Sequence, residues 1–112
     1  MRGALRVKES QSFVELEQRR RPRDARAKKL ISAIHRAELE RARATIEVGL
    51  SLGALIEEKL YANLGHPTFR SLLAELGIGR SQAYKLIALA ERSSAGRIAK
   101  LGVEAAYAEA MR

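Results

Sequence analysis

Five polar side chains stand close together in one short stretch of this 112-residue chain: Arg80, Ser81, Gln82, Tyr84 and Lys85. Lysine and arginine can bind guanine or phosphate oxygens, glutamine can bond adenine through two hydrogen bonds, and serine can bind either kind of group. The chemistry open to this stretch is therefore hydrogen bonding to the edges of nucleic-acid bases and to phosphates.

A glycine-containing turn between two apolar patterns must position these side chains. Spacings of three and four mark one face of a short helix before the turn, at Phe69, Leu72, Leu73 and Leu76, and one face of a second helix after it, at Ala83, Leu86, Ile87 and Ala90. Gly77 suits the positive φ of a sharp turn, Ile78 would fill the space between the helices, and Gly79 would cap the second helix weakly. The pattern predicts a helix-turn-helix with the five polar residues facing outward.

The stretch from Gly77 to Ile87, GIGRSQAYKLI, resembles the turn and recognition helix of bacterial helix-turn-helix proteins, whose common form is GVSRSTVYRLL. A wider likeness, from about Ile46 to Tyr107, is similar to small DNA-binding proteins of phages, plasmids and bacterial chromosomes, and more loosely to the central motif of ParB-type partition proteins. Leu73 stands where the motif prefers Ala, and Gly79 where it prefers a capping Ser. The resemblance implies major-groove binding to double-stranded DNA. An antiparallel helical hairpin is the structural alternative.

A long helix is predicted to precede the motif, over residues 24–64. Asp24 is a suitable N-cap, and no Pro follows until Pro67. Apolar residues form one seam at Leu30, Ile34, Ala37, Ala44, Val48 and Leu55, with Ile31, Ala42, Leu52 and Ile56 beside it. Gly49 and Gly53 share a face, which favours close helix packing over a hinge. The narrow stripe predicts pairing with a second copy, and the alternative is one helix wrapping its own domain.

Residues 1–23 are expected to form a basic, flexible arm, because Pro22 and mutual repulsion disfavour a helix there. Phosphate contacts are expected from Thr68, the N-cap of the first motif helix, and from Arg19, Arg20, Arg21, Arg23, Arg26, Lys28 and Lys29. Such contacts, including entry of the arm into a minor groove, add affinity and salt dependence but no sequence preference. A solubilising tail or a membrane-surface patch is the alternative for this segment.

Residues 65–112 are expected to form the DNA-binding domain. Gly65 and Pro67 should end the long helix. After the motif, Ser94 can cap a short helix that ends at Gly102, and a last helix over 103–111 would cover the remaining apolar faces.

The charge distribution supports a polyanionic partner. The net charge is +8 and the pI is about 10.4. Residues 1–30 hold ten basic and four acidic residues, residues 31–64 four and five, and residues 65–112 seven and four. A nearly neutral middle between two basic segments suits a scaffold with polyanion contacts at either end.

Composition argues against several other functions. There is no Cys, His35 has only Glu38 beside it at helical spacing, as in an ordinary surface pair, and His66 lies in a turn next to Pro67, so no metal site and no cofactor are expected. An enzyme is not expected, since the sequence pattern brings no His together with a hydroxyl and a carboxylate. No apolar run could span a bilayer and no signal peptide is evident, which predicts a cytoplasmic, nucleoid-associated protein without membrane contact.

Together these patterns predict an all-α, dimeric, sequence-specific DNA-binding protein: a transcriptional regulator or a plasmid or phage maintenance factor. The alternative is a helical oligomerising adaptor, such as a phage packaging subunit, whose hairpin binds protein.

Overall fold

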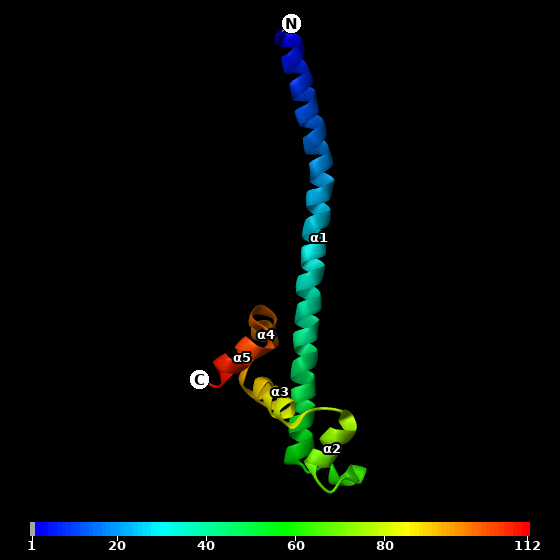
Figure 1. Cartoon of the computed structure of the whole chain (residues 1–112), viewed down its shortest axis with the longest axis vertical. Coiled ribbons are helices and arrows are strands. Elements are labelled where there is room, and N and C mark those ends of the chain that lie inside the picture. Colours follow the sequence, from blue (N-terminus) through cyan, green and yellow to red (C-terminus); the bar gives the residue numbers. More distant parts are fainter. Residues whose placement is uncertain (1) are drawn as a thin grey trace. The chain divides into compact units, whose positions relative to one another are not determined.

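The computed structural model describes the backbone of residues 2–112 and the side chains of residues 18–112. Its elements are α1 (Arg2–Glu57), the 3-10 helix η1 (Ala62–Leu64), α2 (Phe69–Leu76), α3 (Arg80–Arg92), α4 (Ala95–Leu101) and α5 (Val103–Ala110) (Figure 1). No strand occurs in this part of the chain, so the predicted all-α class, with a long first helix and short later ones, is confirmed. The chain divides into two units, Met1–Arg36 and Ala37–Arg112.

The expected helix start at Asp24 was wrong, because α1 already runs through this position and contains Pro22. Residues 18–32 are all exposed, so water can bond the carbonyl group that the missing proline N–H leaves without a donor. The neighbours are strong helix formers, and Asp24 lies beside Arg20, one turn earlier, with 3.8 Å between the carboxylate and Nε. Of the arm expected over residues 1–23, the side chains of residues 1–17 lie outside the described part.

The long helix also ends earlier than predicted, at Glu57 and not at residue 64. Lys59 adopts a left-handed φ of 53°, and the N–H of Leu60 donates to the carbonyl of Leu55 at 3.1 Å. This turn redirects the chain so that Tyr61 packs beside Phe69, with 6.3 Å between the ring centroids. Packing of an aromatic ring therefore ends a helix that the local sequence could have continued.

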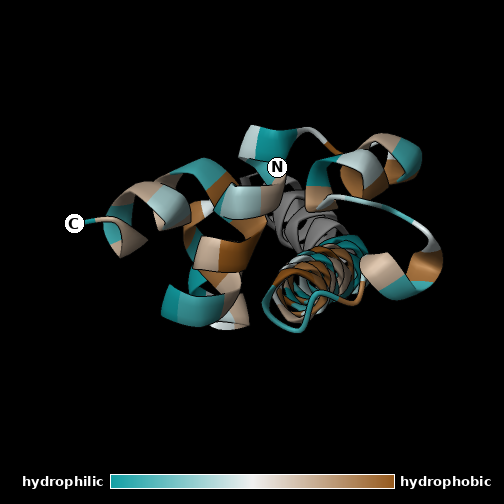
Figure 2. Ribbon diagram, turned by 90° about the horizontal axis from the view of Figure 1, so that it is seen from below, coloured by the Kyte–Doolittle hydropathy of each residue, from teal (hydrophilic) through white to brown (hydrophobic). Residues whose placement is uncertain are grey.

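In the second unit, α2–α5 pack along the C-terminal half of α1 around two groups of buried side chains (Figure 1). The first group joins Leu52 of α1 to Phe69, Leu72, Leu73 and Ala83. The second joins Ala42 of α1 to Leu89, Ile98 and Ala106. Apolar and polar stretches alternate along the short helices (Figure 2), as expected for helices that each bury one side.

The close crossing of α1 and α3 depends on Gly49. A Cβ at this position would lie 2.1 Å from the carbonyl oxygen of Leu86 and 2.8 Å from Cβ of Ala90. A Cβ at Gly53 would meet only the Ile87 side chain, at 3.8 Å. The predicted role of these glycines in helix packing is confirmed. Gly49 is the position at which the close crossing leaves no room for a side chain.

Each of the two predicted groups of apolar residues on α1 enters the core only in part, since Leu55 of the seam packs against the first core group and Ile31 of the other group is 52% exposed. Ala42 and Leu52 are buried, whereas Leu30, Ile34 and Val48 are 54%, 59% and 40% exposed. Because Ala42 and Leu52 complete the two core groups, the compact unit begins at Ala37 and not at the expected boundary near residue 65.

Candidate nucleic-acid interface

Local capping sets the geometry of the α2–α3 motif. The Thr68 hydroxyl accepts a hydrogen bond from the N–H of Ser71 at 3.1 Å, as expected for an N-cap. Gly77 ends α2 with a φ of 71°, and the N–H of Ile78 donates to the carbonyl of Leu73 at 3.0 Å. Gly79 has an extended backbone and starts α3 without a side-chain cap. The predicted turn is confirmed, with Ile78 packed against the first core group.

Four of the five predicted polar residues on α3 are exposed: Arg80, Ser81, Gln82 and Tyr84. The Arg80 guanidinium lies 5.9 Å from the centroid of the Tyr84 ring, a cation–π distance. The Tyr84 ring in turn meets Phe69 edge to face, with 6.3 Å between centroids. Packing on a buried Phe therefore orients the Tyr84 ring, and the ring supports Arg80.

Lys85, the fifth residue, is held differently. Its ammonium group donates to both carboxylate oxygens of Glu104 on α5, at 2.8 and 3.1 Å, and lies 5.4 Å from the Tyr107 ring centroid. Its side chain is only 22% exposed. The sequence suggested a cation facing outward, whereas the structure places Lys85 between α3 and α5, neutralised by a carboxylate 19 residues away.

The structure adds one cation that sequence reasoning missed. Arg70, on α2, is exposed and lines a pocket of about 230 Å³ together with Phe69, Leu73, Arg80 and Tyr84. No ion pair involves Arg70 or Arg80 within the described residues. Two arginines from successive helices thus line one pocket, in which the Tyr84 ring also lies. An arginine in the second position after the Thr68 cap was the sequence signal for this arrangement.

The predicted phosphate-binding cations precede this motif by a long distance in sequence and belong to the first unit. All are exposed: Arg19, Arg20, Arg21, Arg23, Arg26, Lys28 and Lys29. Because they lie on a helix, their side chains point to several sides of it and do not follow one extended strand. This backbone does not fit the extended arm expected for minor-groove entry. Thr68, the eighth predicted phosphate contact, lies on the second unit, where its cap bond leaves the hydroxyl proton available to a phosphate.

His66 lies between a hydroxyl and a carboxylate, an arrangement that sequence reasoning did not foresee. Its Nδ1 is 2.8 Å from the Ser71 hydroxyl, and its Nε2 bonds the Glu75 carboxylate. The Ser71 residue also donates its backbone N–H to the Thr68 hydroxyl. The three side chains join the loop before α2 to that helix.

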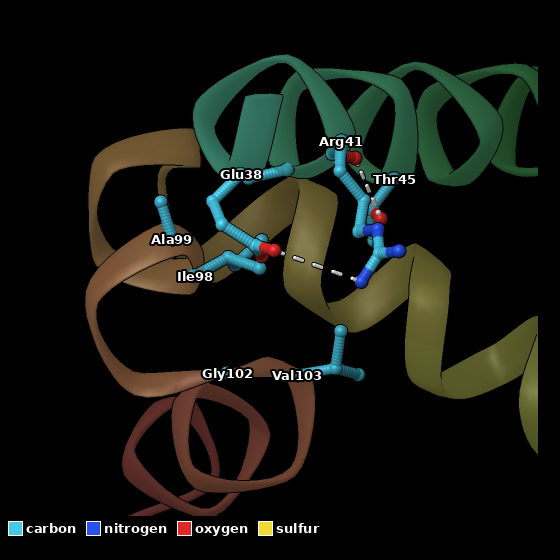
Figure 3. Close-up of a pocket in the computed structure, with 8 residues that line it drawn as sticks. Glu38, Arg41, Thr45, Ile98, Ala99, Gly102 and Val103 are labelled. Carbon is cyan, nitrogen blue, oxygen red and sulfur yellow. Dashed lines mark hydrogen bonds and ion pairs between the residues drawn. The ribbon is translucent and has the colours of Figure 1, made fainter. Parts of the chain in front are cut away.

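A second pocket lies where α1 faces the α4–α5 turn (Figure 3). Ile98, Ala99, Gly102 and Val103 line it opposite Glu38 and Arg41, whose charged groups are 3.9 Å apart. Thr45 donates to the carbonyl of Arg41 at 3.1 Å. The volume of this pocket, about 110 Å³, is below the roughly 300 Å³ that is the lower limit for typical small-molecule pockets. This pocket is too small to hold an effector of ordinary size.

Within the described residues, no group of three or more His, Asp or Glu side chains is arranged to hold a metal ion. The helices of the same residues include none with the length and apolar character of a membrane span. Comparison of the chain with protein-family models, with curated proteins and with solved structures gave no match.

Proposed function

We propose that this protein binds double-stranded DNA in a sequence-specific manner, as a transcriptional regulator or a plasmid or phage maintenance factor. The observation that carries the proposal is the exposed start of α3, where Arg80, Ser81, Gln82 and Tyr84 follow the tight turn at Gly77–Gly79. The first carboxylate of α3 is Glu91, three turns later. A helix start that presents donors and no negative charge suits a major groove lined by phosphates.

The exposed side chains differ in the part of the DNA that each can bind. Gln82 and Ser81 can hydrogen-bond base edges, and Arg80 can bond guanine or a phosphate. Arg70, on the neighbouring helix, adds a phosphate contact that positions the motif without reading sequence. The cations of residues 19–29 contribute sequence-independent affinity.

Two copies are the proposed functional form. The apolar side chains that α1 leaves exposed, among them Leu30 and Ile34, provide surface for contact between copies. The spacing of the two recognition helices would then match that of two half-sites in a palindromic DNA target. The protein would act where DNA is present, in the cytoplasm at the nucleoid.

A helical adaptor that binds protein is the second candidate. It is favoured by exposed apolar side chains around α2, since Leu64 is 62% and Leu76 50% exposed. In that case a partner protein, and not DNA, would cover the start of α3.

Selection of bound DNA from a random pool by the purified full chain tests the proposal. We expect a recovered consensus, with Gln82→Ala reducing discrimination at one base pair by about 1–3 kcal/mol. Arg80→Ala should lower affinity and reduce the slope of log K against log salt by about one. Arg92→Ala removes the same charge from the far end of α3 and serves as the control. Recovery of no consensus, or equal effects of Arg80→Ala and Arg92→Ala, would contradict the assignment and favour the adaptor.

A further inference from the structure

An acidic groove lies on the second unit, on the side of α1 that meets α3. Its floor is apolar, formed by Gly49, Leu50, Gly53, Ala54 and Ala90, and its volume is about 450 Å³. The groove exists because the α1–α3 crossing at Gly49 leaves small side chains on both helices. Leu50 is 57% exposed there, so the floor offers apolar contact to another molecule.

Three carboxylates stand at the edge of this groove: Glu57, Glu58 and Glu91. All three are exposed, and none forms an ion pair within the described residues. Other acidic residues of the same unit are paired, such as Glu104 with Lys85 and Glu109 with Arg97. An apolar floor with unpaired acidic edges fits an amphipathic helix that carries cations beside its apolar residues.

A helix of this kind is part of the same chain. On α1, Arg23, Arg26, Leu30 and Ile34 follow one another at spacings of three and four, so they share one face, and Arg19 lies one turn before Arg23. Leu30, Ile31 and Ile34 are each more than half exposed. Lys28 and Lys29 point to other sides of the helix, since they are offset from Leu30 by two positions and one.

The spacings of the two surfaces match. Leu30 follows Arg23 by seven residues, and Glu57 follows Leu50 by seven residues. In an antiparallel approach, setting Leu30 beside Leu50 brings Arg23 level with Glu57, about 10.5 Å away along each helix. Arg26 comes level with Ala54, within the groove whose edge carries Glu58 and Glu91.

We propose that the acidic groove between α1 and α3 binds residues 19–34 of a second copy of this chain. The proposal deepens the pairing of two copies within the proposed function. Apolar contact at Leu30 and Ile34 supplies affinity, and the charges select the antiparallel direction. The cations on the other sides of the helix, Lys28 and Lys29, stay available to DNA phosphates.

Sedimentation velocity of the full chain without DNA, over a wide range of concentration, tests the contact. The groove variant is Glu57→Lys with Glu58→Lys and Glu91→Lys, and the segment variant is Arg19→Glu with Arg23→Glu and Arg26→Glu. The control reverses three exposed charges on the other sides of the same helix, Lys28→Glu with Lys29→Glu and Arg36→Glu. Circular dichroism checks the helix content of each variant, which should be unchanged because the substitutions are on the surface.

We expect concentration-dependent association of the wild type, weakened about tenfold or more in the groove and segment variants and much less in the control. Mixing the groove variant with the segment variant should restore association, because the two reversed surfaces are again complementary. Absence of association in the wild type, association of the groove variant like the wild type, or failure of the mixture to associate would each overturn the proposal. Since no DNA is present, such a result would leave the assignment of α3 untouched, and the random-pool selection tests that assignment separately.

Discussion

The first turns of α3 and its later turns differ in what their side chains touch. Arg80, Ser81 and Gln82 face solvent, with only a tyrosine ring beside Arg80. Further along the helix, Leu86 contacts Gly49 of α1 through its backbone, and Leu89 is fully buried against α4 and α5. Lys85 lies at the boundary and is paired with Glu104. The start of the helix is exposed to solvent, and the later turns fix its position.

The packed half is most sensitive to a methyl group at the helix crossing. We expect Gly49→Ala to reduce the free energy of unfolding by about 3 kcal/mol or more, because the new Cβ would meet the backbone of α3. Chemical denaturation monitored by circular dichroism measures this. Gly53→Ala is the matched control, since its Cβ fits, and it should stabilise the helix by about 1 kcal/mol. Equal effects of both substitutions would show that the crossing is looser than described.

A substitution at Glu104 can free Lys85 from its ion pair. Glu104→Gln removes the carboxylate that neutralises Lys85. We therefore expect DNA affinity to rise about fivefold and the slope of log K against log salt to steepen by about one, the value for one added phosphate contact. Fluorescence anisotropy titrations at several salt concentrations measure both. Glu109→Gln makes the same change in charge elsewhere on α5 and is the control. No difference between the two variants would place Lys85 outside the DNA contact altogether.

The turn that follows α1 contains a residue with a strained backbone conformation. Lys59 holds a φ of 53° at the end of α1, a conformation that glycine adopts at lower cost. We expect Lys59→Gly to increase the free energy of unfolding by about 0.5–1 kcal/mol in thermal or chemical denaturation. DNA affinity measured in parallel should stay nearly constant, since the turn precedes the motif. Destabilisation would mean that the lysine side chain stabilises the native turn.

The smallest effect is expected at the α4–α5 pair that helps to cover the packed half of α3. Arg97 donates to both carboxylate oxygens of Glu109, at 2.8 and 2.6 Å, and these hydrogen bonds lower the pKa of Glu109 and raise that of Arg97. A lowered folded-state pKa stabilises the protein above the ordinary glutamate range, near 4.3, and this stabilisation disappears as the pH falls through the folded-state pKa. Wild type should therefore exceed Glu109→Gln slightly in thermal stability at neutral pH, and the difference should vanish in acid. A difference that persists at low pH would exclude an ionic origin.

Local signals in the sequence were sufficient for the motif but not for its surroundings. Thr68 as a cap and Gly77 as a left-handed turn depend on neighbouring residues, and both were predictable. The start of α1 was not, because exposure to water let Pro22 remain within a helix. Leu89 was missed because α3 buries two faces, and a single helical period reveals only one.

Contacts between distant residues account for the rest of what was missed. The Lys85–Glu104 pair joins residues 19 apart, and nothing near Lys85 in the sequence indicates it. His66 finds Ser71 and Glu75 only after the loop folds onto α2. DNA binding, pairing of copies and the roles of the basic residues stay predictions from sequence and exposure.

The α1–α3 crossing has one further consequence. Gly49 meets α3 through the carbonyl oxygen of Leu86, an atom that every amino acid carries. The side chains at positions 80–82 contribute nothing to this contact, so they can be exchanged without altering how α3 is held. The unit from Ala37 to Arg112 is therefore suited as a scaffold on which a library of new residues at three surface positions can be screened for binding.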